Sequence, residues 1–219
     1  MFGKQSKYEL CPNCIEAEKF SYDEASRHQM RKEFGIDEND VVIGHIGRFA
    51  PVKNHPFILK IFEKIVLIEN NTKLCLCGVG ADKDKIISIV NANETIKNNV
   101  VFLPVGDVSK YYSLFDVFIL PSYHEGFPLS LLESQASGCL SFASDTITRE
   151  VQLSDLVEYI KIDDEQKWID NITSSFCRLK NIERKKYNLV IKESPYDVDC
   201  ATCFLVSYYE RVLKEHLKS

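Results

Sequence analysis

The sequence predicts an α/β fold, a Rossmann-like parallel sheet with helices on both faces, followed by terminal helices. From about residue 41 onward, short apolar runs alternate with segments whose apolar residues recur every three or four positions, as in βαβ units. Most runs are apolar throughout, which is typical of strands buried on both faces. The expected strands span residues 41–47, 73–79, 99–105, 117–122, 140–144 and 157–162.

The segments between these runs are predicted to be helices. The first begins near Pro56 and places apolar side chains on one face, for example Ile58, Ile61 and Ile65. The others are expected over residues 83–91, 108–115, 129–137 and 166–179. Beyond Leu179 the pattern is helical only, with a break at Ser194-Pro195 and a last amphipathic helix over residues 198–217.

These patterns divide the chain into three parts. Residues 41–179 are expected to form the Rossmann-like domain, and residues 180–219 the C-terminal helices. Residues 1–40 carry a turn at Pro12-Asn13 and a charged helix over residues 22–34, which ends at Gly35, but no strand. We interpret them as a linker and as the remnant of an N-terminal domain region.

Composition excludes several classes of protein. The 219 residues include 27 basic and 32 acidic side chains, and the formal net charge of −5 argues against a dedicated nucleic-acid binder. No apolar segment follows Met1 as in a secretory signal, and no run approaches the roughly 18 apolar residues of a membrane span. We therefore expect a cytoplasmic protein whose eight cysteines are reduced thiols.

No metal or other cofactor is expected. The pairs Cys11/Cys14 and Cys200/Cys203 have Cys-x-x-Cys spacing, but the first lies in a turn and the second in a helix without a flanking histidine. The Asp-x-Asp sequences at residues 82–84 and 197–199 each begin a helix, where aspartate is favoured electrostatically.

The loops that follow the strands are where an open parallel sheet binds ligands. The first, residues 47–54, carries Gly47, Arg48 and Lys53 just before a helix. Two cations beside a helix N-terminus fit a phosphate, although an ordinary surface loop has the same composition. His45, in the strand before this loop, could contact a ligand, but a core position is favoured.

The next two loops give weaker signals. Gly78-Val79-Gly80 permits close approach of backbone or ligand, yet it lacks the third glycine of a dinucleotide fingerprint, which argues against an NAD-dependent epimerase. In the loop Val105-Gly106-Asp107 the aspartate is placed to cap the following helix, and contact with a ligand is an equally good interpretation.

The fourth loop, residues 122–133, is the most informative. Pro128 suits a first helical turn, so we expect the free amides of Leu129 and Ser130 to point outward at an anion. Glu125 lies in the loop, beside His124, and Glu133 lies inside the helix within an apolar stretch. A partly buried Glu133 requires a hydroxyl or a cation as its partner.

In this order and spacing, the motifs resemble the C-terminal, nucleotide-sugar-binding domain of the family 4 retaining glycosyltransferases of GT-B fold. The resemblance runs from about residue 12 to residue 179. It rests on Pro12-Asn13-Cys14-Ile15, Gly47-Arg48-Phe49 with Lys53, Gly78-Val79-Gly80, residues 116–122, and Glu125-Gly126-Phe127-Pro128 with Glu133. The two glutamates are this family's hallmark. Residues 53–55, 134–138 and 144–151 are similar to bacterial capsule and exopolysaccharide transferases.

The resemblance implies a UDP-sugar donor and no metal. Arg48 and Lys53 would bind the diphosphate, Glu133 the ribose hydroxyls and Glu125 the hydroxyls of the donor sugar, so that Glu125, Arg48 and Lys53 form the catalytic set. The donor-binding positions also include Gly47, Gly78, Val105, Gly106, Gly126, Phe127, Pro128, Leu129 and Ser130. A hexose or an N-acetylhexosamine would pass, with retention, to a growing surface polysaccharide or lipid-linked acceptor at the inner face of the plasma membrane, with peripheral membrane association.

The chain departs from the family in part. Cys14 stands where relatives have glycine or alanine, residues 79–82 replace a Gly-Asp-Gly-Pro-like loop, and nothing corresponds to the N-terminal, acceptor-binding domain, although Phe2-Gly3-Lys4 resembles its end. We expect the donor-binding half of a transferase, incomplete for turnover. The alternative is a non-catalytic UDP-sugar-binding subunit that needs a separate acceptor-binding chain. An unpartnered apolar face on the last helix would favour a homodimer.

Overall fold

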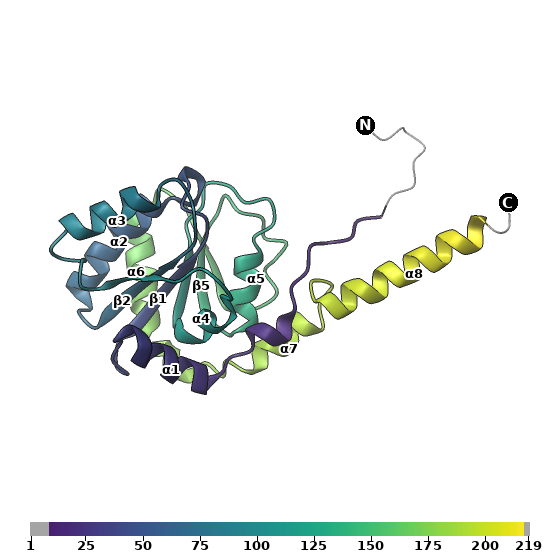
Figure 1. Cartoon of the computed structure of the whole chain (residues 1–219), viewed down its shortest axis with the longest axis horizontal. Helices are drawn as coiled ribbons and strands as arrows, with labels where there is room; N and C mark the ends of the chain where they lie inside the picture. The colour runs from purple at the N-terminus through teal and green to yellow at the C-terminus, as the bar shows by residue number, and fades with distance from the viewer. Residues whose placement is uncertain (1–8, 217–219) are drawn as a thin grey trace.

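A computed structural model describes residues 9–216, and it contains a parallel six-stranded sheet in the order β3-β2-β1-β4-β5-β6 (Figure 1). The strands are β1 (Val41–Ile46), β2 (Thr72–Cys77), β3 (Val100–Leu103), β4 (Val117–Leu120), β5 (Leu140–Ser144) and β6 (Val157–Ile160). Each corresponds to one predicted apolar run. β5 ends at the predicted residue, and the other five strands end one or two residues earlier than predicted. The predicted fold class is confirmed.

Helices cover both faces of the sheet. One face carries α2 (His55–Ile68), α3 (Lys83–Ala92) and α6 (Glu165–Ser175), and the other carries α1 (Glu24–Phe34), α4 (Ser109–Leu114), α5 (Leu129–Ala136) and α7 (Lys186–Lys192). Short 3-10 helices are η1 (Ala17–Phe20), η2 (Pro51–Lys53) and η3 (Phe176–Asn181), and the last helix is α8 (Val198–His216). Two hydrophobic cores result, one on each face of the sheet.

The strand order reverses between β1 and β4. β1 pairs with β2 along its whole length and with β4 through Ile43 and Gly44. The chain proceeds from β1 toward β3 on one side and from β4 toward β6 on the other, so the helices that follow β1 and β4 cover opposite faces of the sheet. This switch point, at the carboxyl ends of the strands, is where open α/β sheets bind ligands.

The segment that the sequence suggested as a linker packs onto the domain from Ile15 onward. Ile15 donates a backbone hydrogen bond to the Tyr196 carbonyl (2.8 Å) and accepts one from the Val198 amide (2.9 Å). Ala17 and Met30 are buried in the core beneath α4 and α5. Asp23 caps α1 by accepting from the amides of residues 25 and 26, and Gly35 (φ 65°) ends it. The expected domain remnant at residues 2–4 lies outside the described residues.

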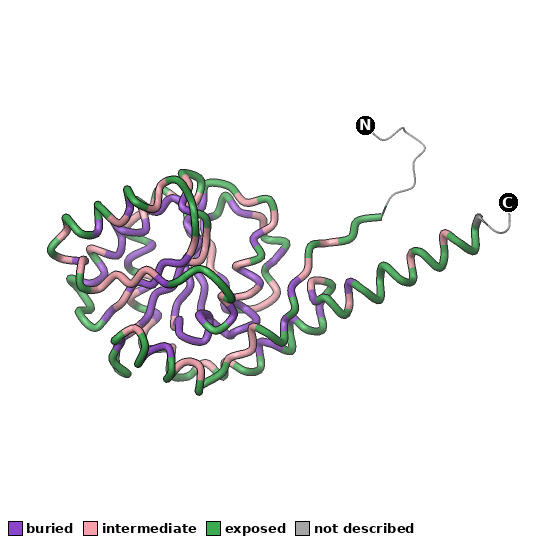
Figure 2. The backbone as a smooth tube through the Cα atoms, in the orientation of Figure 1, coloured by how far each residue is buried: buried purple, intermediate pink, exposed green. Residues whose placement is uncertain are grey.

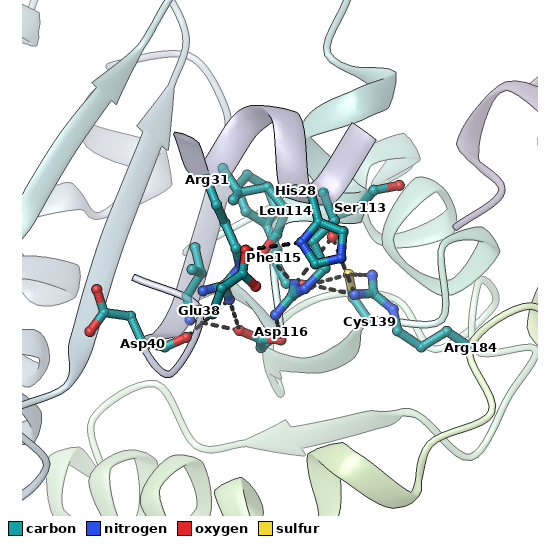
Figure 3. A network of polar contacts seen from close by, with 12 residues as sticks. His28, Arg31, Glu38, Asp40, Ser113, Leu114, Phe115, Asp116, Cys139 and Arg184 are labelled. Carbon is teal, nitrogen blue, oxygen red and sulfur yellow. Dashed lines mark hydrogen bonds and ion pairs between the residues drawn. The ribbon is translucent and has the colours of Figure 1, made fainter. Parts of the chain in front are cut away.

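Arg27 and Arg184 anchor these helices through polar contacts, and Figure 3 shows Arg184 beside Phe115 and Cys139. Arg27 pairs with Asp116 (2.7 Å) and joins α1 to the start of β4. Arg184, in front of α7, donates to the carbonyls of Tyr112 (2.7 Å), Phe115 (2.9 Å) and Ser137 (2.9 Å), which no longer have helical partners. The ends of α4 and α5 are thereby held together.

Helix α8 projects away from the domain, and the chain from residue 9 runs outward on the same side (Figures 1 and 2). An ion pair between Arg211 and Glu9 joins the two segments. The predicted apolar face is exposed, for example at Phe204 (36%) and Leu213 (62%). The predicted helix end at residue 217 lies outside the described residues. Within residues 9–216 no helix combines the length and the apolar character needed to cross a bilayer.

Candidate functional site

The loops after β1 and β4 meet at the switch point. The Tyr123 amide donates to the Val52 carbonyl (2.9 Å), which joins the two loops through their backbones. Beside this bond, Lys53 Nζ and Glu125 Oε1 form an ion pair at 2.6 Å, with side chains only 16% and 12% exposed. Two of the predicted site residues, separated by 72 positions in the chain, are therefore in direct contact.

Local backbone structure fixes where Lys53 and Arg48 lie. Lys53 ends the single turn η2, and Asn54 then adopts a left-handed conformation (φ 56°) from which α2 starts. This sharp turn directs the lysine back toward Glu125. Arg48 lies at the tip of the same loop, exposed, and makes no hydrogen bond or ion pair with the described residues. Its guanidinium group is available for an anion.

Gly47 and Gly78 bring the first two loops together. The Gly47 amide donates to the Cys77 carbonyl (3.0 Å) and the Phe49 amide to the Val79 carbonyl (2.7 Å). Gly78 has φ 155°, and a Cβ atom there would lie 1.9 Å from the Gly47 carbonyl oxygen. The expected close approach is therefore that of one backbone to another.

Glu133 has the hydroxyl partner that its sequence environment required. The Tyr112 hydroxyl, from the buried face of α4, donates to Glu133 Oε2 at 2.5 Å. Burial raises the pKa of Glu133, while the hydrogen bond from Tyr112 opposes that rise. One carboxylate oxygen is held and the other is left for further contacts. The sequence did not reveal Tyr112, since a tyrosine at helical spacing is typical of a core.

The loop before α5 differs from expectation at one amide. Leu129 does not present a free N–H, because its amide donates to the Phe127 carbonyl (3.0 Å). The amides of Gly126, Phe127 and Ser130 make no hydrogen bond within residues 9–216. Pro128 is the N-cap residue of α5, and those three amides are the ones in this loop that remain available to an anion.

Val105 and Gly106, which were also predicted to bind the donor, do not contact the Lys53–Glu125 pair. Val105 and Gly106 are exposed on the loop after β3, two strands away from β1. Asp107 accepts a hydrogen bond from the Ser109 amide (3.0 Å) at the start of α4, although the N-cap residue of this helix is Val108. The Phe127 ring packs against Tyr196 (5.3 Å between centroids), which ties the loop to the C-terminal segment.

Two buried histidines lie beneath the loops. His45, in β1, and His55, at the start of α2, contact each other edge to face with 4.9 Å between ring centroids, and His55 stacks on Phe49. They are 0% and 1% exposed. Burial lowers the pKa of His45 well below its ordinary value, and burial together with the charge of Lys53 lowers the pKa of His55 to about 4.

The lowered pKa of His55 predicts sensitivity to acid. The folded protein keeps His55 neutral, whereas the unfolded chain takes up a proton below about pH 6.5. The stability that depends on the neutral ring is complete above that pH and is lost as the pH falls toward 4. Between pH 7 and pH 4.5 we expect the free energy of unfolding to fall by about 2 kcal/mol through this group.

Urea unfolding of the parent and of His55→Phe at the two pH values measures this effect. The substitution keeps an aromatic ring against Phe49 but removes the titration, so the variant should lose about 2 kcal/mol less than the parent. The exposed His124→Phe serves as the matched control and should follow the parent. An equal loss in the parent and in His55→Phe would contradict the prediction.

The site therefore combines groups for two kinds of ligand atom. Arg48, Lys53 and the free amides before α5 suit phosphate oxygens, and the carboxylates of Glu125 and Glu133 suit hydroxyl groups. No group of three or more His, Cys, Asp or Glu side chains arranged for a metal ion was found among residues 9–216.

Two cavities lie near these elements. One of about 340 Å³ lies beside the loop after β1 and is lined by Ala50, Pro51, Asn54, His55, Pro56, Asp82, Lys85, Ile86 and Tyr123. A second, of about 500 Å³, lies at the opposite end of the sheet, beside Arg27 and Asp116. In the second cavity Arg27 is already bound to Asp116 and to the Leu114 carbonyl. We place the ligand chemistry at the first end of the sheet, where Lys53 and Glu125 lie together.

The sequence matches a known family model. Residues 26–174 match the model described as glycosyl transferases group 1. The putative glycosyltransferase EpsF of Bacillus subtilis is 32% identical over 156 residues, which is 69% of this chain and 40% of the relative. The capsular polysaccharide biosynthesis glycosyltransferase CapH of Staphylococcus aureus is 27% identical over 184 residues, which is 82% of this chain and 50% of the relative. The chain thus spans at most half of either relative.

Solved structures share the fold. The Anabaena protein HepE, crystallised with UDP and glucose, superposes with a TM-score of 0.76 at 14% identity, over 92% of this chain and 56% of that one. The C-terminal domain of the group 1 glycosyl transferase LpcC of Francisella tularensis superposes with a TM-score of 0.64 at 18% identity, over 86% of this chain and 97% of that domain. The described fold is therefore shared with the C-terminal domain of LpcC.

Proposed function

The chain belongs to the glycosyl transferases group 1 family, and we propose that it is the donor-binding half of a retaining hexosyltransferase. Its donor is a UDP-sugar, and the hexose or N-acetylhexosamine passes to a growing surface polysaccharide or a lipid-linked acceptor. The observation that carries the proposal is the Lys53–Glu125 pair at the switch point, because it joins a phosphate-binding cation to a hydroxyl-binding carboxylate.

The reaction explains why such groups belong together. When the anomeric bond of a nucleotide sugar breaks, the leaving diphosphate gains negative charge and the sugar gains oxocarbenium character. Positive groups that are already in place stabilise the developing charge without reorganisation. Arg48, Lys53 and the free amides of the loop before α5 are proposed to act on the diphosphate.

The carboxylates have separate roles in this proposal. Glu125 accepts hydrogen bonds from hydroxyls of the donor sugar, which releases Lys53 toward the diphosphate. Glu133 accepts from the ribose hydroxyls, and Tyr112 holds it in place through the hydrogen bond to Oε2. HepE, crystallised with UDP and glucose on the same fold, supports a UDP-sugar as the donor. The acceptor is proposed to be bound by a part corresponding to the portion of the relatives that this chain does not match.

Calorimetric titration with UDP tests the proposal. We expect the chain to bind UDP in preference to GDP and NAD. Lys53→Met removes a positive charge that would face the diphosphate, and Glu133→Gln weakens the contact with the ribose hydroxyls. Each substitution should reduce the affinity for UDP by about tenfold or more, the usual effect of losing a hydrogen bond to a charged group.

Two matched variants control for general effects of charge. Lys60→Met, on the outer face of α2, and Glu94→Gln, 81% exposed, change the same residue types away from the loops. They should bind UDP like the parent. The proposal fails if UDP does not bind, or if the site variants and the control variants bind it equally well.

A further inference from the structure

Within residues 9–216, four of the six buried side-chain nitrogen and oxygen atoms that lack a hydrogen-bond partner lie beneath the candidate donor site. These four belong to three residues at the carboxyl ends of β1 and β4 and at the start of α2, namely His45 Nε2, His55 Nδ1 and Nε2, and Ser122 Oγ. Buried polar groups in folded proteins are nearly always hydrogen-bonded. A cluster of exceptions at one edge of the sheet therefore indicates a site that is completed in another state of the protein.

The tautomer of His45 follows from its one hydrogen bond. His45 Nδ1 lies 2.9 Å from the Ile119 carbonyl oxygen, which can only accept, so Nδ1 carries the proton and donates it. The ring is fully buried and neutral. Nε2 is therefore unprotonated, and no hydrogen-bond donor among the described residues contacts its lone pair. A phosphate oxygen without a proton cannot donate a hydrogen bond to it.

The donor that can reach this lone pair is Lys53. A Cβ atom on Gly47 would lie 2.9 Å from His45 Nε2 and 3.3 Å from Lys53 Cδ, so the missing side chain of Gly47 leaves a gap between the two. The ammonium group is two bonds beyond Cδ, and rotation of the side chain can move it from Glu125 to the ring nitrogen.

We propose that His45 is a positioning residue, whose Nε2 accepts a hydrogen bond from the Lys53 ammonium when the diphosphate of the donor draws Lys53 away from Glu125. The inference rests on the proposed function, since the diphosphate is what competes with Glu125 for Lys53. In the free protein Lys53 pairs with Glu125 at 2.6 Å. In the complex His45 holds the ammonium beside Gly47, where its remaining protons face the diphosphate.

Two substitutions separate the two nitrogens of the ring. His45→Asn places an amide N–H near Nδ1 and keeps the bond to Ile119, but it removes the acceptor. His45→Gln extends to the position of Nε2 and keeps the acceptor, but it gives up the bond to Ile119. If the role of His45 is purely structural, His45→Gln should weaken UDP binding more than His45→Asn does. If His45 positions Lys53, His45→Gln should weaken UDP binding less.

The inference is tested by titration with UDP. The proteins to compare are the parent, both His45 variants, Lys53→Met and the double variant His45→Asn/Lys53→Met. His45→Asn should weaken UDP binding by about tenfold, and His45→Gln by no more than about threefold. On the Lys53→Met background His45→Asn should change the affinity by less than about twofold, because the effect acts through the lysine.

Several results would overturn the inference. One is an unchanged affinity for UDP in His45→Asn, and another is a greater loss of affinity in His45→Gln than in His45→Asn. A third is a loss of affinity in the double variant that equals the product of the losses in the two single variants. Failure of the parent to bind UDP would instead overturn the proposed function, and the inference with it. If His45→Asn does not fold, ¹⁵N NMR of the parent decides: UDP should shift the unprotonated Nε2 resonance of His45, and an unmoved resonance contradicts the inference.

Discussion

Replacement of Asp116 by alanine is expected to lower the free energy of unfolding by about 3–5 kcal/mol, the usual cost of breaking a buried ion pair. Asp116 binds Arg27 at 2.7 Å and Arg31 at 3.2 Å, and it accepts the Val42 amide at 2.9 Å (Figure 3). The Arg31 side chain is 1% exposed, and burial lowers its pKa. Without the carboxylate, two largely buried guanidinium groups lose their counter-charge.

Denaturant unfolding at pH 7 measures this loss, and hydrogen exchange locates it, since the amides of α1 should exchange faster in the variant. Asp116→Asn, which still has an acceptor for Val42, should be intermediate. The control is Glu94→Ala, which removes an exposed ion pair with Lys97 and should cost about 1 kcal/mol or less. A loss in Asp116→Ala no larger than that of the control would contradict the prediction.

The sheet was predictable because its chemistry is local. Strands buried on both faces need continuous apolar runs, and each run from Val41 to Ile160 appears as a strand. The N-terminal segment was not predictable in the same way. Its contacts are made by backbone groups of Ile15 and by Arg31, a charged residue whose burial depends on Asp116, 85 positions away. Pattern analysis assigns such a residue to a solvated face.

The edge of the sheet that carries the site was also predictable, because loops after parallel strands converge there. The contacts within the site were not. The sequence indicated Lys53 and Glu125 as separate ligands of a donor, but their pairing requires the register between β1 and β4. Tyr112 was missed because its hydroxyl has a role only once α4 lies beside α5.

Gly78→Ala is expected to lower the free energy of unfolding by about 3 kcal/mol or more, through backbone strain and a steric clash. Gly78 has φ 155°, a conformation that residues with a Cβ rarely adopt, and the added carbon would lie 1.9 Å from the Gly47 carbonyl oxygen. That neighbour is backbone, held by the bond from the Gly47 amide to Cys77. The loops after β1 and β2 would have to separate.

Gly106→Ala is the matched control, because a Cβ there has no neighbour within 4 Å and its φ is not positive. It should leave the protein as stable as the parent, or more stable by about 0.4–1 kcal/mol. Denaturant unfolding compares the two alanines, and UDP titration adds a second measure, since separation of the loops displaces Arg48 and Lys53. Equal stability of both variants would contradict the close approach of Gly47 and Gly78. A loss confined to Gly78→Ala, together with weaker UDP binding, would show that this backbone contact positions the cations of the donor site.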